Sequence, residues 1–256
     1  MDRSAPVFRV VIPARYASTR FPGKAVANLH GKPMIQHVYE RAADSRAAEV
    51  IIATDDERVS QAAATFGAPV AMTSNLHESG TDRVAEVASH HGWQSDDIVV
   101  NVQGDAPTIP ASSISLVAEL LDRHPAADLA TLCVPVTGRD DYSSPNVVKV
   151  VMDAEGRALY FSRSPIPAMG HGSDGFPQEV WRHLGIYAYR VGALQRLTAA
   201  PQCYLETTEK LEQLRALWLG MEIRVVVAPE VHGPDVDTPE DLAAAAAYLA
   251  GSADHG

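Results

Sequence analysis

The chain has 256 residues, of which 46% are hydrophobic, and a formal net charge of −11 at pH 7. This length and composition can bury a sizeable core, so we expect a folded globular protein. The acidic balance argues against broad contact with nucleic acid or an anionic membrane, because either partner would be repelled. An anionic small ligand would therefore need a local cluster of cations.

Cysteine usage and hydropathy predict where the protein resides. Cys133 and Cys203 are the two cysteines, with no CxxC spacing and no histidine-rich surroundings, so we interpret both as reduced thiols. The amino terminus lacks the apolar run of a secretory signal, and the segment LAAAAAYLA is far shorter than the ~20 residues that span a bilayer. These features predict a cytoplasmic protein without membrane contact.

Short β-branched runs alternate with amphipathic segments in the first half of the chain. Strands are predicted at 8–14, 49–55, 69–73 and 97–105, and helices at 33–45, 56–66, 81–91 and 112–123. In the first of these helices Ile35 and Val38 share one face, as expected of a helix packed on a sheet. The alternation is typical of βαβ units, and it predicts an α/β fold with a mostly parallel, doubly wound sheet.

The spacing changes after residue 123. The strand-like segments LATLCVPV, NVVKVVMD, ALYFSRSPIP and HLGIYAYRV follow without full-length helices between several of them. They predict a smaller β-rich lobe at about 135–205 within a single domain that spans 1–256. Glycines and a proline indicate a surface loop or lid at 168–178.

The chain is predicted to close with a helix, a strand and a second helix. Leucines at helical spacing indicate a helix within 207–220, and β-branched residues indicate a strand at 222–230. Thr238 before Pro239 is a typical start of the last helix, with Thr238 as its N-cap.

Positive charge is concentrated in VIPARYASTRFPGK, residues 11–24, directly after the first predicted strand. Arg15, Arg20 and Lys24 can contact phosphate, and Ser18 adds a neutral donor. Ligands of parallel sheets bind beyond the carboxyl ends of the strands, where this loop would lie. The segment is neither a Walker A loop nor a GxGxxG motif, although its composition suits a triphosphate. A solvated basic turn is the alternative.

Two aspartates follow predicted strands and could converge over one edge of the sheet. Asp105 ends the segment 97–105, and Asp237 comes just beyond the last strand. Attack on the α-phosphate of a nucleotide needs Mg²⁺ held by hard oxygen ligands. A turn position for Asp105 and a capping position for Asp237 are the alternatives. Asp235 and Asp237 also form a D-x-D string, which suggests a glycosyltransferase, but its place near the carboxyl terminus argues against that.

Nine sequence segments, taken together, cover nearly the whole chain from Val10 to about Leu249. They are PARYASTRFPGKAVANLHGKPMIQHVYERA, ATDDERV, SGTDRVAEV, VNVQGDAP, PNVVKVVMD, ALYFSRSPIP, RHLGIYAYR, EKLEQLRALWLG and VDTPEDL. In sequence and order they resemble the successive blocks of the CMP-Kdo synthetases, the cytidylyltransferases that activate 3-deoxy-manno-octulosonate (Kdo).

The resemblance implies a nucleotidyltransferase-type Rossmann-like fold, a homodimer, and transfer of CMP from CTP to an acidic acceptor, Kdo, for lipopolysaccharide biosynthesis. It implies that Asp105 and Asp237 hold Mg²⁺ and act in catalysis with Arg15 and Lys24. The nucleotide-binding residues that it implies are Ala14, Arg15, Ser18, Arg20, Lys24, Ser79, Thr81, Arg83 and Asp105. The acceptor-binding residues are Gln103, Arg163, His183, Tyr187, Glu206 and Glu209.

Simpler interpretations remain for several of these residues. Ser79 or Thr81 could be an ordinary helix cap, and His183 a structural histidine. Glu209 and Glu212 could form the solvated face of a helix.

Two positions depart from the family pattern. Ala106 stands in GDAP where Glu or Gln is usual, and Ala168 stands where a bulky residue commonly follows SRxxIP. Smaller side chains enlarge or neutralise that part of a pocket, which leaves 8-amino-Kdo or a small phosphonate such as phosphonoformate as alternative acceptors. Ala106 also leaves open a nucleotide-binding protein without activity.

Overall fold

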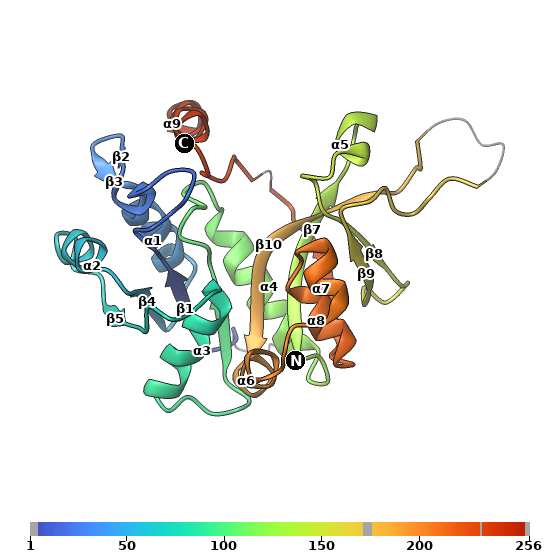
Figure 1. The fold of residues 1–256 in the computed structure, drawn as a ribbon, viewed down its shortest axis with the longest axis horizontal. Helices are drawn as coiled ribbons and strands as arrows, with labels where there is room; N and C mark the ends of the chain where they lie inside the picture. Colours follow the sequence, from blue (N-terminus) through green and yellow to red (C-terminus); the bar gives the residue numbers. More distant parts are fainter. Residues whose placement is uncertain (1–4, 171–175, 231, 254–256) are drawn as a thin grey trace.

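The computed structural model describes residues 5–170, 176–230 and 232–253. Within these residues a nine-stranded sheet has the order β11-β7-β10-β6-β1-β4-β5, and β8 and β9 branch from β10 (Figure 1). Its strands are β1 Phe8–Pro13, β4 Glu49–Thr54, β5 Val70–Met72, β6 Ile98–Asn101, β7 Leu129–Pro135, β8 Lys149–Met152, β9 Ala158–Ser162, β10 Trp181–Arg190 and β11 Ile223–Val227. A separate hairpin pairs β2 (Asn28–Leu29) with β3 (Lys32–Pro33).

The sheet is mostly parallel in its first half, as predicted. Strands β5, β4, β1 and β6 run parallel to one another, and β11 runs parallel to β7. The long strand β10 lies between β6 and β7 and is antiparallel to both. Beyond this point β8 pairs with β10 and β9 in antiparallel fashion, so the predicted β-rich segments extend the main sheet.

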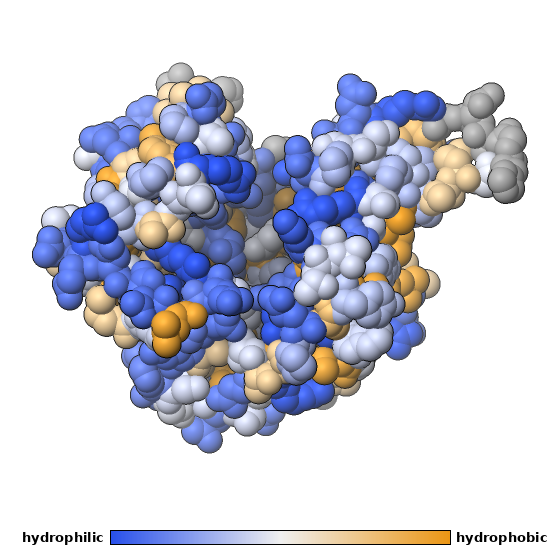
Figure 2. All heavy atoms as spheres, in the orientation of Figure 1, coloured by the Kyte–Doolittle hydropathy of each residue, from blue (hydrophilic) through white to orange (hydrophobic). Residues whose placement is uncertain are grey.

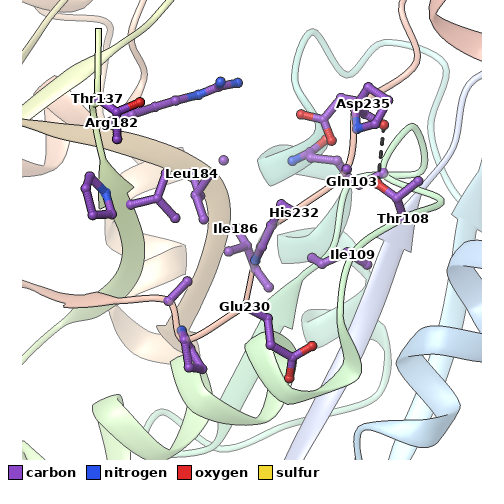
Figure 3. A pocket seen from close by; sticks show the side chains of 18 residues that line it. Gln103, Thr108, Ile109, Thr137, Arg182, Leu184, Ile186, Glu230, His232 and Asp235 are labelled. Atoms are coloured by element: carbon purple, nitrogen blue, oxygen red, sulfur yellow. Dashed lines mark hydrogen bonds between the residues drawn. The ribbon is translucent and has the colours of Figure 1, made fainter. Parts of the chain in front are cut away.

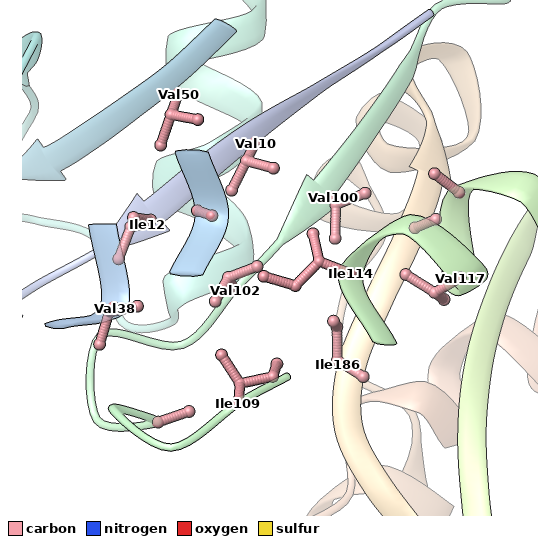
Figure 4. Packing of buried hydrophobic residues seen from close by; sticks show 14 of the residues in the cluster. Val10, Ile12, Val38, Val50, Val100, Val102, Ile109, Ile114, Val117 and Ile186 are labelled. Atoms are coloured by element: carbon pink, nitrogen blue, oxygen red, sulfur yellow. The ribbon is translucent and has the colours of Figure 1, made fainter. Parts of the chain in front are cut away.

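Helices cover both faces of the sheet. They are α1 Met34–Asp44, α2 Glu57–Ala64, α3 Gly80–His90, α4 Ala111–Arg123, α5 Arg139–Ser143, α6 Val191–Ala199, α7 Tyr204–Glu209, α8 Gln213–Trp218 and α9 Pro239–Ala253, with a 3₁₀ turn, η1, at Lys24–Val26. Successive side chains of a strand point to opposite faces. In β1, Val10 and Ile12 therefore lie in one buried cluster with residues of α1, α2 and α4 (Figure 4). Val11 lies in the cluster on the other face, with residues of α3, α6 and α8. Burial of each such side chain contributes roughly 1.5–3 kcal/mol.

Two predicted elements differ from the structure. The segment 207–220 is not one helix, because Lys210 adopts a left-handed conformation (φ 53°) that ends α7 before α8 begins. The strand predicted at 97–105 ends at Asn101, so Gln103 and Asp105 lie in a loop. Of the predicted loop 168–178, residues 171–175 lie outside the described part of the chain. The last helix begins as predicted, since Thr238 Oγ1 accepts a hydrogen bond of 3.2 Å from the Asp241 amide.

The parallel strands place several loops at one edge of the sheet. Because β1, β4, β5, β6 and β11 run in the same direction, the segments that follow them meet beyond their carboxyl ends. These segments include the basic loop 14–23 and residues 102–110, 228–230 and 232–238. The edge therefore brings together the predicted basic residues and the two predicted metal-binding aspartates.

A buried ion pair joins α3 to the loops that follow β4 and β5 at this edge. Arg83 on α3 is fully buried, and its Nη2 lies 3.0 Å from Oδ2 of Asp55, which follows β4. Its Nη1 donates to the hydroxyl of Thr73, which follows β5. A buried guanidinium is stable only when it is paired, so Asp55 compensates for much of the cost of burying Arg83.

We predict that Asp55→Ala lowers the free energy of unfolding by about 3 kcal/mol, because it leaves a buried charge unpaired. Urea denaturation followed by circular dichroism measures this change. The matched control is Glu40→Ala, which breaks an ion pair with Lys32 whose two side chains are more than 40% exposed; it should cost less than about 1 kcal/mol. Equal effects of the two substitutions would contradict the anchoring role.

Candidate active site

One ammonium group joins the two predicted catalytic aspartates. Lys24 Nζ lies 2.7 Å from Asp105 Oδ2 and 3.1 Å from Asp237 Oδ1, and it donates to the Val236 carbonyl at 2.9 Å. Arg20 contacts the other oxygen of Asp237 at 2.9 Å. Burial alone would lower the pKa of Lys24, but the two carboxylates outweigh it and raise the pKa. Three segments far apart in sequence therefore meet at one charged point.

Close backbone approach holds these loops together. A Cβ at Gly104 would lie 2.8 Å from the Pro13 carbonyl oxygen, so a side chain at this position would push the loops after β1 and β6 apart. The Val236 amide donates to the Asp105 carbonyl at 2.8 Å. In the basic loop Gly23 has φ +75°, a conformation that glycine adopts without strain. The positions of the charged side chains are therefore set by the backbone as well as by ion pairing.

The basic loop lines a cavity of about 250 Å³. Its walls include Ala14, Arg15, Ser18, Arg20, Lys24 and Asp105 from the predicted nucleotide site, together with Thr19, Gly80 and Gln103. Arg15 also donates a hydrogen bond to the carbonyl of His77. A cavity with three cationic side chains on one wall can accept a strongly anionic group in a protein of negative net charge.

The remaining predicted nucleotide residues lie at or below the start of α3. Ser79 is the N-cap of α3 and forms a capping box with Asp82, so the simpler interpretation of Ser79 as a cap also holds. Thr81 donates to Glu212. Arg83 has no exposed surface and is engaged by Asp55, so any contribution that it makes to ligand binding is indirect.

A second cavity, of about 230 Å³, opens beside the first. Two predicted acceptor residues, Gln103 and Tyr187, line it with Ser79, Thr81, Asn101, Tyr189, Glu212 and Gln213. The Tyr187 hydroxyl is buried and has no hydrogen-bond partner among the described residues; the nearby Thr131 hydroxyl instead contacts His183 and two carbonyls. Burial raises the pKa of Glu212.

The other four predicted acceptor residues are engaged elsewhere. The guanidinium of Arg163 donates to the carbonyls of Glu209 and Pro145, and Glu209 itself accepts from Ser162 Oγ at 2.7 Å. Glu206 is buried against Arg215 at 2.9 Å. Burial lowers the pKa of His183 to about 3, so the ring is neutral. None of these four residues lines either cavity.

Sequence reasoning missed Glu212 as a cavity residue. It was interpreted as part of a solvated helix face with Glu209, but the break at Lys210 turns Glu212 toward Thr81. Its place between buried Leu211 and Leu214 is the one signal that could have indicated partial burial. Asn101 and Gln213 were missed as well, and no motif marks them.

A third cavity, of about 740 Å³, lies where the surface of the molecule is hollowed between its two halves (Figure 2). Figure 3 shows Arg182 and Thr137 on one wall and Asp235 and Gln103 on the other. Asp235 lines this cleft, where desolvation of its carboxyl, together with the nearby Asp105 and Asp237, raises its pKa to about 6. Gln103 lines all three cavities, so it marks their junction.

Comparison with known proteins supplies independent evidence. Residues 9–223 match the family model described as "Cytidylyltransferase". The chain is 54% identical to the 3-deoxy-manno-octulosonate cytidylyltransferase of Thioalkalivibrio sulfidiphilus, over 92% of this chain and 96% of the relative. It is 50% identical to the enzyme of that name from Coxiella burnetii, over 94% and 99% of the two chains.

A solved structure agrees with these relatives. The structure of a CMP:2-keto-3-deoxy-manno-octonic acid synthetase complexed with CTP is 43% identical, with a TM-score of 0.89 over 96% of this chain and 100% of that chain. The fold and the order of the sequence blocks thus agree with what the resemblance implied. The chain belongs to the cytidylyltransferase family and, within it, to the 3-deoxy-manno-octulosonate cytidylyltransferases.

Proposed function

We propose that this enzyme transfers CMP from CTP to Kdo, giving CMP-Kdo and pyrophosphate. The observation that carries the proposal is the cluster of Lys24, Asp105 and Asp237 beside the cationic cavity, in a chain that belongs to this family. The acceptor oxygen attacks the α-phosphorus of CTP directly, and pyrophosphate leaves without a covalent enzyme intermediate.

The chain's own residues bind and orient the triphosphate. Arg15, Arg20 and Lys24 offset the charge that grows on the departing pyrophosphate, because fixed cations stabilise developing negative charge without reorganisation. Ser18 and the backbone of the basic loop add neutral donors. Ser79 and Thr81 line the second cavity on either side of Gly80, which lines both cavities, and there they suit contacts to the base or ribose.

The donor set fits Mg²⁺. Asp105 Oδ2, Asp237 Oδ1 and the Val236 carbonyl oxygen all lie within 3.1 Å of Lys24 Nζ, so three hard oxygens already surround one cation. No group of three His, Cys, Asp or Glu side chains suited to a metal occurs in the described residues. Two carboxylates completed by phosphate oxygens are the usual arrangement for Mg²⁺. When bound, Mg²⁺ would supply charge neutralisation at the phosphates.

Kdo is the acceptor that the relatives favour. The curated relatives carry 3-deoxy-manno-octulosonate in their names, which argues against 8-amino-Kdo, a phosphonate or an inactive binding protein. The glycosyltransferase interpretation of Asp235 and Asp237 is not favoured either, given the family. The polar cavity with Gln103, Tyr187 and Glu212 suits an acceptor rich in hydroxyls. Arg163, His183, Glu206 and Glu209 stay predictions that would require movement or an indirect role.

The assembly and location remain predictions. A homodimer is supported by exposed apolar side chains: Leu159 and Tyr204 within the β-rich lobe at about 135–205, and Trp218 beyond it, are each more than half exposed. The described residues contain no helix long and apolar enough to cross a membrane. Both cysteines are free and buried, which is consistent with the predicted cytoplasmic location.

We predict that Lys24→Ala or Asp105→Ala removes at least ~3 kcal/mol of transition-state stabilisation, more than about 100-fold in turnover, with the fold intact. Pyrophosphate release from CTP measures the effect with Kdo, 8-amino-Kdo and phosphonoformate as acceptors and with other nucleotides as controls. Lys32→Ala removes a cation that pairs with Glu40, and it should leave turnover unchanged. Near-normal turnover by either variant would refute its role; CTP binding without turnover on any acceptor would favour the inactive binder.

We also predict that chelation with EDTA abolishes pyrophosphate release and that added Mg²⁺ restores it. Mn²⁺ bound in the presence of CTP, followed by electron paramagnetic resonance, tests the site directly. Asp105→Ala and Asp237→Ala should each weaken Mn²⁺ binding at least tenfold, since each removes a carboxylate ligand. Asp44→Ala alters an exposed carboxylate at the end of α1 and is the matched control. Unchanged Mn²⁺ binding in both site variants would place the metal elsewhere.

A further inference from the structure

The segment 73–79, between β5 and α3, is held at its two ends by Arg83 and Asp82 and in between by the carboxylate of Glu86. Glu86, on the second turn of α3, accepts a hydrogen bond from the Ser74 amide at 2.9 Å through Oε2. The same oxygen contacts Nε2 of His77. Both side chains are largely buried, with 19% of Glu86 and 23% of His77 exposed. Glu86 therefore fixes the segment at two points.

The backbone of this segment also contacts Arg15. The carbonyl oxygen of His77 accepts a hydrogen bond from Nη2 of Arg15, whose side chain lines the cavity of the basic loop. Arg20 and Lys24 are oriented by Asp237, whereas Arg15 forms no ion pair with a carboxylate among the described residues. The position of its guanidinium therefore depends on a backbone carbonyl, and that carbonyl depends on Glu86.

The charge state of Glu86 suits this arrangement. Burial alone would raise its pKa, but the Ser74 amide and the nearby His77 and His90 outweigh burial and lower the pKa. The contribution of His90 is peripheral, because its Nε2 lies 3.9 Å from Glu86 Oε1 and 64% of its side chain is exposed. Glu86 is thus an ionised acceptor whose close contacts are Ser74 and His77.

We propose that Glu86 and His77 are positioning residues that orient Arg15 toward the triphosphate of CTP. The inference rests on the proposed function, in which Arg15 binds that triphosphate. A guanidinium carries five N–H donors, so Arg15 can keep its bond to His77 while its other donors face a phosphate. Without the hydrogen bond to the His77 carbonyl, the long side chain of Arg15 must become ordered when the nucleotide binds, and this ordering lowers the affinity for CTP. Glu86 and His77 themselves do not touch the reacting atoms.

The test is a double-mutant cycle on CTP affinity, measured by titration calorimetry. Arg15→Ala should weaken CTP binding at least tenfold. Glu86→Ala should weaken it about fivefold to tenfold, and His77→Ala should have a similar effect, because each releases the segment from α3. In the Arg15→Ala background, however, Glu86→Ala should cause no further loss. His90→Ala is the matched control and should bind CTP like the unaltered protein.

The possible outcomes distinguish the role of Arg15 in CTP binding from the role of Glu86 and His77 in positioning Arg15. If Arg15→Ala leaves CTP affinity unchanged, the proposed role of Arg15 is wrong and the inference falls with it. If Arg15→Ala weakens binding but Glu86→Ala and His77→Ala do not, the inference alone is overturned. The inference would also be overturned if Glu86→Ala lowered CTP affinity equally with and without Arg15. Such a result would show that Glu86 affects CTP binding through α3 and not through Arg15. Should Glu86→Ala fail to fold, His77→Ala and its double variant with Arg15→Ala provide the same cycle.

Discussion

The site depends on one electrostatic constraint, the sharing of a single ammonium group by two aspartates. Asp105 and Asp237 follow different strands, and their carboxylates approach the same Lys24 ammonium. Without that cation the two negative charges would repel each other. Lys24 Nζ contacts both and also the Val236 carbonyl. The backbone adds a second link, since the Val236 amide donates to the Asp105 carbonyl. The same oxygens that hold the ammonium are suited to a divalent cation, so the cluster that joins the loops also prepares the site for its chemistry.

Buried charges elsewhere in the fold are each paired or hydrogen-bonded as well. Arg83 on α3 is paired with Asp55 after β4, and Arg215 on α8 is paired with Glu206 on α7. In the β-rich lobe the buried Lys149 ammonium donates to the carbonyls of Ser144, Val147 and Arg163. Such groups are costly to bury and add little net stability. Their value here is geometric, because each one ties together segments that no regular element connects.

In the proposed reaction, separate cavities receive the nucleotide and the acceptor. The cationic cavity suits the triphosphate, and the polar cavity with Tyr187 and Glu212 suits a hydroxylated acceptor. Gln103 lies at their junction and also reaches the larger cleft, beside Ala106. Ala106, a departure from the usual Glu or Gln of the family, lines that larger cleft and neither of the two smaller cavities. Its effect is therefore separate from the contacts proposed for CTP and for the acceptor.

Much of the fold was predictable from sequence because local patterns report burial. The alternation in β1 directs Val10 and Val11 to opposite layers, and the basic loop and both aspartates could be assigned to one edge once the strands were recognised as parallel. The acceptor side was not predictable in the same way. Helical spacing alone treated Glu209 and Glu212 as equivalent, but a left-handed residue at Lys210 separates them. The sequence alone determined which segments are buried and which family they resemble. Only the tertiary structure decided which polar side chains share a cavity. The reason is that local periodicity does not encode the direction of the chain after a helix ends, or the contacts between distant loops.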